Sequence, residues 1–413
     1  MLQLRRGVRR FGISVALAIA SVGIFAAVPG ATPLKTIAAA HSARPLAAGC
    51  ARAAAAGSAT CLAQAKNRGI SRGIDYTTSP DGVGLFPSQI KAAYNWPTRA
   101  RAGAGETIAI VDAFDNPAVE ADLAVFDKQF GLPECTIKNK CLTKVNSQGG
   151  KSLPPYSEIW EFEISIDVQW AHAIAPGAKI LLVEATTDAD PDMYAAEDYA
   201  KHHAKYISNS WITNETPDVS QLDKHFIQPG VSFFAGSGDS GLSPGYPAAS
   251  PKVVSVGGSQ LNYDANGKLL NETGWALGGG GCAQYEKASD AQADFRLYHQ
   301  VGCAGMRAFP DVSANASDQS LTAVYDSNVI GGVPGGWFGA WGTSVATPEL
   351  AARAADAHIL VNSATIYSSR LKFRDITGGG NGATCLPGYN LCAGRGSWIT
   401  LLPHEEQGDS SGD

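Results

Sequence analysis

The chain has 413 residues, of which 45% are hydrophobic, and a formal net charge of −6 at pH 7. This length and hydrophobic content are ample for a large buried core, and the negative charge argues against nucleic acid as a general partner. Charged residues, at 17%, are fewer than average, and glycine, with 46 residues, is abundant. We therefore expect a globular protein with a large core and no nucleic-acid partner.

The N-terminus, residues 1–31, has the pattern of an export signal. Arginines cluster within residues 5–10, an apolar run covers residues 11–28, and small residues follow it. This pattern is a secretory signal peptide more often than folded structure. The apolar run is also long enough for an uncleaved membrane anchor. We expect a secreted protein with no stable membrane partner unless the signal is left uncleaved.

The cysteine content agrees with export, because an even number of cysteines in an exported chain suggests disulfides. Zinc is a weaker explanation, since no Cys-x-x-Cys motif or neighbouring histidine completes a ligand set. The chain has 8 cysteines, which allow 105 connectivities. Pairing each cysteine with its neighbour along the chain is therefore a hypothesis. The expected pairs are Cys50–Cys61, Cys135–Cys141, Cys282–Cys303 and Cys385–Cys392.

Residues 32–75 are rich in Ala, Ser and Gly, and we expect a loosely ordered, low-complexity leader there. Residues 76–402 form the expected globular domain, in which apolar runs alternate with helical patterns. The expected helices span residues 85–94, 118–130, 160–172 and 192–204, and the expected strands span residues 107–113, 179–185, 206–211, 231–235 and 253–256. The tail, residues 403–413, is acidic and predicted to be disordered.

The order of these elements predicts an α/β fold. Continuous apolar strands are typical of buried parallel strands, and their alternation with helices predicts a mostly parallel twisted sheet with helices on both faces. Ligands of such sheets bind at the carboxyl ends of the strands.

Ser344 is the candidate nucleophile. It follows a glycine-rich run that ends at Gly342, and Pro348 and an alanine-rich segment come after it. Glycine permits sharp turns, proline fits the first turn of a helix, and alanine favours helix. We therefore expect Ser344 at a helix N-terminus, where free N–H groups and the helix dipole favour a developing oxyanion. The same pattern is also that of an ordinary helix N-cap.

Two carboxylates could serve as the base that a serine nucleophile needs. Glu163 and Asp167 are four residues apart in a helical pattern, so both lie on one helix face. Carboxylates held close together share a proton, and one pKa rises. The alternative is a solvated acidic face. Against it, neither residue has a Lys or Arg one turn away, and Trp160 and Trp170 flank the same side.

A third carboxylate, Asp239, follows the expected strand at residues 231–235 in a Gly-Ser-Gly-Asp turn. A protonated Asp at the carboxyl end of a strand could donate a hydrogen bond to an oxyanion. The alternative is a turn aspartate that caps its own backbone.

Taken together, several motifs resemble the sedolisin (serine-carboxyl peptidase) family, which is related to subtilisin. The resemblance spans roughly residues 76–400, and its motifs occur in the family's order. They are Glu163-x-x-x-Asp167 followed by Val168-Gln-Trp-Ala-His-Ala-Ile-Ala-Pro-Gly-Ala-Lys179, Ser208-Asn-Ser-Trp211, Ser237-Gly-Asp-Ser-Gly241, Tyr246-Pro-Ala-Ala249, Pro310-Asp-Val-Ser-Ala314 and Gly342-Thr-Ser-Val-Ala-Thr-Pro348.

The resemblance implies a subtilisin-like three-layer sandwich and a secreted serine-type endopeptidase that hydrolyses peptide bonds at acidic pH. It makes Ser344 the nucleophile, Glu163 the base and acid, Asp167 its orienter and Asp239 the oxyanion-hole acid. Asp112 lies near the position of the subtilisin aspartate, and we expect it behind the residues that react. Protein or peptide substrates are the implied partners, and we expect a monomer.

The family also implies one calcium ion near the C-terminus. Residues 375–382 resemble the first half of its site, with the Asp375 carboxylate and the Ile376 carbonyl as ligands. In the second half, the carbonyls of Leu386 and Gly388 could bind, and Asn390 would offer a neutral oxygen where the family has a charge. Fewer charged ligands weaken calcium binding, so we expect a weak site. The alternative is a glycine-rich turn closed by a disulfide.

Other departures from the family favour an alternative function. Trp341 stands where the family commonly has glycine, which would crowd the site. Residues 32–75 are too few for the long folded propeptide of the family. These features favour a catalytically silent secreted relative that binds peptides or acts as a surface protein. A subtilisin-type triad of Asp112, His172 and Ser344 is a further alternative, although His172 points to another part of its helix.

Overall fold

The structure is a computed structural model that describes residues 56–66 and 83–400. The expected signal peptide, most of the expected leader and the expected acidic tail lie outside these residues, as does Cys50. Within the described ranges, none of the helices combines the length and the apolar character needed to cross a membrane.

An eight-stranded sheet is the centre of the described domain, in the order β10-β9-β8-β6-β3-β5-β4, with β13 beside β9. All neighbouring strands are parallel except β10, which is antiparallel to β9. The strands are β3 (Thr107–Ala113), β4 (Leu142–Asn146), β5 (Lys179–Ala185), β6 (Tyr206–Asn209), β8 (Ser232–Gly236), β9 (Val254–Tyr263), β10 (Leu269–Gly274) and β13 (Val312–Asn315). The expected mostly parallel α/β fold is therefore confirmed.

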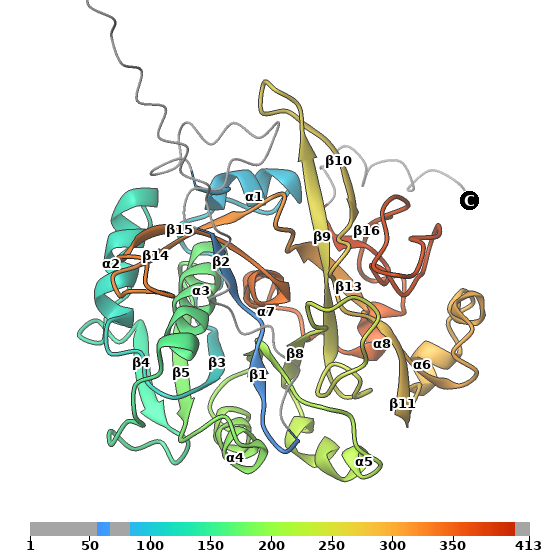
Figure 1. Cartoon of the computed structure of the whole chain (residues 1–413), viewed down its shortest axis with the longest axis horizontal. Helices are drawn as coiled ribbons and strands as arrows, with labels where there is room; N and C mark the ends of the chain where they lie inside the picture. The colour runs from blue at the N-terminus through green and yellow to red at the C-terminus, as the bar shows by residue number, and fades with distance from the viewer. Residues whose placement is uncertain (1–55, 67–82, 401–413) are drawn as a thin grey trace, which may run out of the picture. The chain divides into compact units, whose positions relative to one another are not determined.

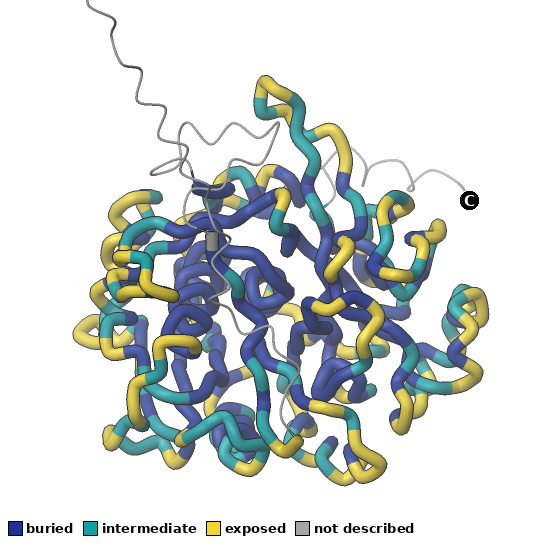
Figure 2. Tube along the Cα trace, viewed as in Figure 1, coloured by how far each residue is buried: buried dark blue, intermediate teal, exposed yellow. Residues whose placement is uncertain are grey.

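Both faces of this sheet are covered. Successive side chains of a strand point to opposite faces, and every residue of β3 and β5 after the first is buried. Figure 2 shows the same distribution, with the sheet and central helices buried and the exposed residues mainly in the connecting loops. A near-continuous apolar run is what a strand with two covered faces requires, which explains why both strands were predicted to the residue.

The helices that position the site are α3 and α7, which pack against each other beside the sheet (Figure 1). Helix α7 also contacts β6 and β8, while α4 packs on β3 and β5. The α-helices are α1 (Pro87–Ala93), α2 (Val119–Phe130), α3 (Glu158–Ile174), α4 (Asp190–Ala200), α5 (Val219–Leu222), α6 (Asp290–Ala293), α7 (Thr343–Ala357) and α8 (Ser363–Ile366). Two short 3-10 helices are η2 (Asp223–Phe226) and η3 (Tyr298–Val301).

Shorter strands form smaller sheets around the central one. β1 pairs with β7, β2 with β15, β15 with β14, β11 with β12, and β16 with β17. Their bounds are β1 (Thr60–Cys61), β2 (Gln64–Lys66), β7 (Trp211–Ile212), β11 (Gly281–Lys287), β12 (Met306–Phe309), β14 (Thr322–Asp326), β15 (Gly336–Trp341), β16 (Phe373–Arg374) and β17 (Ser397–Trp398).

The structure corrects several expected elements. The leader is not loosely ordered throughout, because β1 and β2 are paired strands within it. Pro348 does not open a helix but is the sixth residue of α7, which begins at Thr343. Proline there cannot donate to the Ser344 carbonyl one turn earlier, and Thr347 Oγ1 donates to the neighbouring Thr343 O at 2.7 Å. The expected helix at residues 192–204 begins earlier and ends earlier, as α4.

The disulfides agree with pairing by proximity where the structure describes both partners. Cys135–Cys141, Cys282–Cys303 and Cys385–Cys392 are formed. Cys61 is also disulfide-bonded, but its expected partner Cys50 lies outside the described residues.

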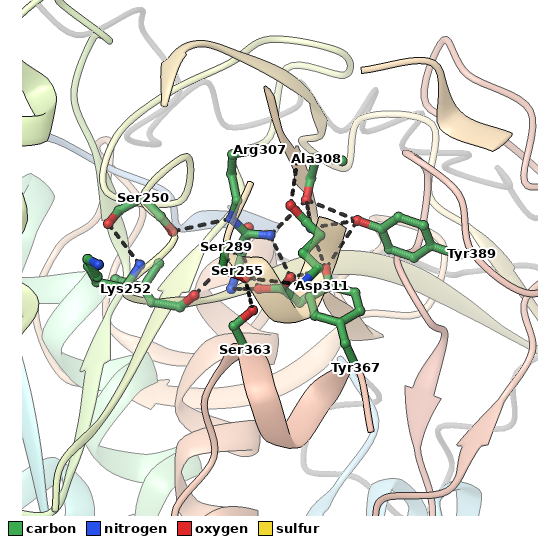
Figure 3. Close-up of polar contacts among 12 residues, drawn as sticks. Ser250, Lys252, Ser255, Ser289, Arg307, Ala308, Asp311, Ser363, Tyr367 and Tyr389 are labelled. Carbon is green, nitrogen blue, oxygen red and sulfur yellow. Dashed lines mark hydrogen bonds and ion pairs between the residues drawn. The ribbon is translucent and has the colours of Figure 1, made fainter. Parts of the chain in front are cut away.

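A buried ion pair between Arg307 and Asp311 joins the segment that runs from β12 to β13. Arg307 Nη1 and Nη2 donate to the two oxygens of Asp311, each at 2.6 Å, and neither side chain is exposed to solvent. Asp311 also accepts from the Ser255 N–H at 2.8 Å and from the Tyr367 hydroxyl. Figure 3 shows these groups converging on the Asp311 carboxylate, with Tyr389 bonded to the same network. The network therefore ties β12 and β13 to β9 and to the C-terminal segment.

We predict that Asp311→Ala lowers the free energy of unfolding by about 3–5 kcal/mol, because it leaves the Arg307 guanidinium buried and unpaired. Lys205→Ala is the control, since it removes a pair with Glu106 in which Lys205 is 59% exposed, and such pairs contribute about 1 kcal/mol or less. Urea unfolding curves of both variants measure the difference. Equal, small losses would contradict a structural role for the buried pair.

Candidate active site

Ser344 is the second residue of α7, directly after Thr343, and is completely buried. The expected position at a helix N-terminus is confirmed. The preceding Gly342 has φ of 125°, a conformation that glycine alone adopts readily. A β-carbon on Gly342 would lie 2.4 Å from the Leu62 carbonyl oxygen and 2.5 Å from Asp239 Oδ2. Glycine is therefore needed here both for the turn and for the close approach of these two groups.

Glu163 and Asp167 lie on α3, and both are fully buried, so the solvated acidic face is wrong. Glu163 Oε2 accepts hydrogen bonds from the backbone N–H groups of Leu62, at 2.8 Å, and Ala63, at 2.6 Å. Burial raises the pKa of Glu163 well above its ordinary value, and the Ser344 hydroxyl offsets only part of this rise. The Ser344 hydroxyl makes no well-formed hydrogen bond to Glu163, because neither Ser344 Oγ nor Glu163 Oε1 has a partner among the described residues.

Asp167 is held by another residue. Its Oδ1 accepts from the Ser210 hydroxyl at 2.8 Å, while its Oδ2 has no partner in the described part of the chain. The charge of Glu163 nevertheless raises the pKa of Asp167, after the larger effects of burial and of Asp112. Asp167 is thus an electrostatic neighbour of Glu163 that Ser210 orients.

Asp112, expected behind the reacting residues, forms a cluster of buried carboxyl groups with Glu163 and Asp167. It is completely buried, and both its oxygens lack a hydrogen-bond partner in the ranges that the structure describes. Burial raises the pKa of Asp112 to about 8. Burial first, and then the charge of Asp112, raises the pKa of Glu163 well above its ordinary value. The protonation of each of the three carboxyl groups therefore depends on the charge of the others.

Asp239 follows β8 and is bound to the residue that precedes Ser344. Its Oδ1 accepts from the Thr343 N–H at 2.8 Å and from the Thr343 hydroxyl at 2.9 Å. Burial raises the pKa of Asp239 to about 7, although the Thr343 hydrogen bonds lower it. Asp239 is therefore protonated at acidic pH. Its Oδ2, which has no partner within the described residues, is then free to donate.

The histidine alternative is wrong. His172 Nε2 lies 2.9 Å from the Pro133 carbonyl oxygen and 3.4 Å from Asp127 Oδ1, on the side of α3 that faces α2. Burial lowers the pKa of His172 to about 4. The ring lies near Cys135 and Cys141, but their disulfide removes the thiolates that a metal would need.

Trp341, which was expected to crowd the site, belongs to a strand that pairs with the leader. It is the last residue of β15, largely buried, and lies opposite Gln64 of β2 in the antiparallel register. Its backbone thus belongs to a strand pair that leads directly to Gly342. What sequence reasoning missed is the partner of that strand, because nothing in the alanine-rich leader indicates pairing.

The expected calcium ligands do not fit a calcium ion in this arrangement. Asn390 Nδ2 donates to the carbonyl oxygens of Leu386, at 2.7 Å, and Ile376, at 3.5 Å. Asn390 Oδ1 turns away, where it accepts from the N–H groups of Cys392 and Ala393 at 3.0 and 2.7 Å. The opposite amide orientation would set an NH2 group against two N–H donors, so the hydrogen bonds fix the assignment.

The Asp375 carboxylate is also satisfied internally. Both oxygens of Asp375 accept from the Gly388 N–H, at 3.0 and 2.9 Å, so Gly388 presents a donor rather than its carbonyl to Asp375. The Asn390 amide thus occupies the place where a cation would bring the two carbonyls together. The expectation that Asn390 supplies a ligand oxygen is wrong.

We predict that calcium and a chelator give the wild-type protein the same melting temperature. Asn390→Asp replaces the donor by a carboxylate, so its melting temperature should rise with calcium, by the equivalent of about 2.7 kcal/mol at a hundred times the dissociation constant. Asn390→Ala is the control and should lose stability without responding to calcium. A calcium-dependent melt of the wild type would show that the amide does not replace a cation.

Comparisons with known proteins identify a family and two curated relatives. The model of the subtilase family matches residues 161–370. The chain is 27% identical over 376 residues to kumamolisin from Bacillus sp. (strain MN-32), covering 78% of this chain and 64% of kumamolisin. It is 27% identical over 201 residues to sedolisin from Pseudomonas sp. (strain 101), covering 40% of this chain and 32% of sedolisin. It therefore spans less than two thirds of the length of these curated relatives.

A solved structure supports the fold. Pseudomonas sedolisin, a serine-carboxyl proteinase complexed with two molecules of pseudo-iodotyrostatin, superposes with a TM-score of 0.64 at 23% identity. The match covers 76% of this chain and 95% of that chain. The subtilisin-like fold is thus shared although most residues differ. The chain belongs to the subtilase family, and its relatives place it in the sedolisin group of that family.

Proposed function

We propose that this chain is a serine-type endopeptidase of the serine-carboxyl kind, with protein or peptide substrates. The observation that carries the proposal is the surroundings of Ser344. Glu163 is buried on α3, which packs against α7, the helix that carries Ser344, and Asp239 is hydrogen-bonded to the adjacent Thr343. The solved sedolisin, described as a serine-carboxyl proteinase, supports the same class of activity.

Each of these residues has a role in the proposed reaction. Ser344 attacks the scissile carbonyl carbon while Glu163 accepts its proton, and Glu163 then protonates the departing amine. Asp239, protonated, donates to the oxyanion together with the N–H groups at the start of α7. Asp167 and Asp112 hold protons beside Glu163, so that its pKa is set by the whole cluster rather than by one group.

We also propose that the protein is exported and acts as a monomer. The apolar N-terminal run of the sequence and the three disulfides between described cysteines support export to an oxidising compartment. Light scattering of the intact protein tests whether it is a monomer. Non-reducing mass mapping of the exported protein tests whether its disulfides form.

Digestion of a denatured protein at acidic pH tests the activity. Ser344→Ala and Glu163→Gln should each lower the rate by about 10⁴-fold or more, because the groups act as a unit. Glu349→Gln is the matched control. Glu349 is a fully buried carboxyl on α7 that has no role in the proposed reaction, and its variant should retain most of the activity. Thermal melts check that each variant is folded. If the folded wild type digests nothing at any pH, the silent-relative alternative replaces this proposal.

We predict that activity falls as pH rises through about 7, because Asp239 loses the proton that it donates. On the acid side, activity falls when Glu163 is already protonated, and burial raises that pKa as well. The alkaline limb of the profile should thus lie near pH 7, and the acid limb should lie above the pH of about 4.3 that an unshifted glutamate gives. Asp239→Asn keeps a donor without its titration, so its activity should persist at higher pH with a lower peak rate. A pH profile that Asp239→Asn leaves unchanged would refute the role of Asp239.

A further inference from the structure

Cys135, Cys141 and His172 form a group of metal-binding side chains on the side of α3 that faces α2. Their two sulfur atoms and a ring nitrogen of His172 all lie within 4.8 Å of one another. Helices α2 and α3 pack against each other (Figure 1), which brings His172 of α3 to the segment after α2 that carries both cysteines. The fold thus supplies the histidine that no neighbour of these cysteines in the sequence provides.

The ring of His172 has the orientation of a metal ligand. Its Nε2 lies 2.9 Å from the Pro133 carbonyl oxygen, which can only accept, so in the neutral ring Nε2 carries the proton and donates. Nδ1 then has a free lone pair, and this buried atom has no hydrogen-bond partner among the described residues. Histidines that bind metals commonly donate their other ring N–H to a carbonyl or carboxylate in this way.

The backbone holds the two cysteines in place without help from their sulfur atoms. Asn139 Oδ1 accepts from the N–H groups of Thr136, at 3.0 Å, and Cys141, at 2.9 Å. The Cys135 N–H donates to Asp127 Oδ2 at 3.1 Å. The Cα atoms of the two cysteines lie 4.9 Å apart. Because these hydrogen bonds do not depend on the disulfide, two thiols at these positions would stay side by side when no disulfide joins them.

Two thiolates and one imidazole are a ligand set that suits zinc. With Zn–S distances of about 2.3 Å and Zn–N distances of about 2.0 Å, the ligand atoms of a tetrahedral site lie about 3.5–4 Å apart. Once the disulfide bond is absent, rotation of the cysteine side chains separates the sulfur atoms to this spacing. Cys135 is buried and Cys141 is partly exposed, so water has access to the fourth position from the side of Cys141.

We propose that the chain binds one zinc ion through Cys135, Cys141 and His172 before the disulfide between the two cysteines forms. The ion closes the segment between α2 and β4 in the reduced chain, as the disulfide closes it in the oxidised chain. This site is separate from the proposed peptidase reaction and does not depend on it.

Both steps balance. Each of the two thiols releases one proton to water as its sulfur atom binds zinc. The later oxidation uses a disulfide-carrying oxidant, which takes two electrons from the two thiolates and two protons from water and becomes two thiols. The sulfur atoms of Cys135 and Cys141 then bond to each other, and the zinc ion returns to water.

The test is metal binding to the full chain after reduction with a phosphine in the absence of oxygen. Cobalt(II) is the probe, because thiolate ligands give it an absorption that disappears when zinc replaces it. The reduced wild type should bind cobalt with this absorption and release it to one equivalent of zinc. The oxidised protein should show no such absorption.

Two double variants assign the site. Cys135→Ala with Cys141→Ala should lose the cobalt absorption. Cys385→Ala with Cys392→Ala is the matched control and should keep it, since no similar group of three ligands surrounds that pair in the described part of the chain. Near-UV circular dichroism shows whether each reduced variant is folded.

His172→Gln tests the third ligand. Glutamine keeps an N–H group that can donate to the Pro133 carbonyl but removes the imidazole nitrogen. Zinc affinity of the reduced variant should fall at least about 10-fold, the size of loss that even the supporting residues of metal sites produce.

Alkylation of the reduced wild type with and without zinc provides a measurement that does not depend on the folding of a variant. Mass mapping should show that zinc protects Cys135 and Cys141 and leaves the alkylation of Cys385 and Cys392 unchanged.

Several outcomes would overturn the inference. They are a reduced wild type that binds no metal or stays unfolded in the presence of zinc, cobalt absorption that survives the loss of Cys135 and Cys141, zinc affinity that His172→Gln leaves unchanged, and equal protection of all the cysteines. None of these outcomes bears on the peptidase proposal, which concerns Ser344.

Discussion

Burial of three carboxyl groups beside one serine is the constraint on which the rest of this site depends. Asp112, Glu163 and Asp167 come from β3 and α3, and none of them forms an ion pair with a lysine or arginine in the described part of the chain. Removal of carboxylates from water is costly unless they are paired or protonated. The protein meets this cost by raising their pKa values, so that the cluster holds protons that a solvated carboxylate would release.

That constraint explains the leader segment. Within the described residues, Glu163 accepts its hydrogen bonds from the backbone of Leu62 and Ala63, so the base is satisfied by a peptide segment that lies in the site. The same two residues are themselves buried, and the Leu62 carbonyl oxygen lies beside Gly342 at the start of α7. A bound peptide and an ionised Glu163 therefore stabilise each other, which links occupation of the site to the readiness of the base.

In the C-terminal segment, buried polar groups must also be satisfied, and here neutral hydrogen bonds satisfy them. Carbonyl groups that converge must be satisfied by a cation or by a donor. Here the Asn390 amide bonds to the carbonyls of Ile376 and Leu386, and its oxygen bonds to the next backbone turn. The segment is also tied to the sheet through Tyr389 and the buried pair of Arg307 and Asp311. Internal hydrogen bonds thus stabilise the segment in which the sequence pattern implied a calcium ion.

The sequence by itself determined the parallel sheet, because strands buried on both faces have continuous apolar sequences, as in residues 107–113 and 179–185. It also determined that Glu163 and Asp167 share a face and that Ser344 begins a helix, since both follow from local spacing. Only the tertiary structure decided that Asp112 joins the cluster, that β1 and β2 enter the site, and that the Asn390 nitrogen faces the carbonyls. These are contacts between segments far apart in the chain. Local propensity does not encode them, because the pairing of a short alanine-rich strand or the orientation of an amide depends on partners that only folding brings near.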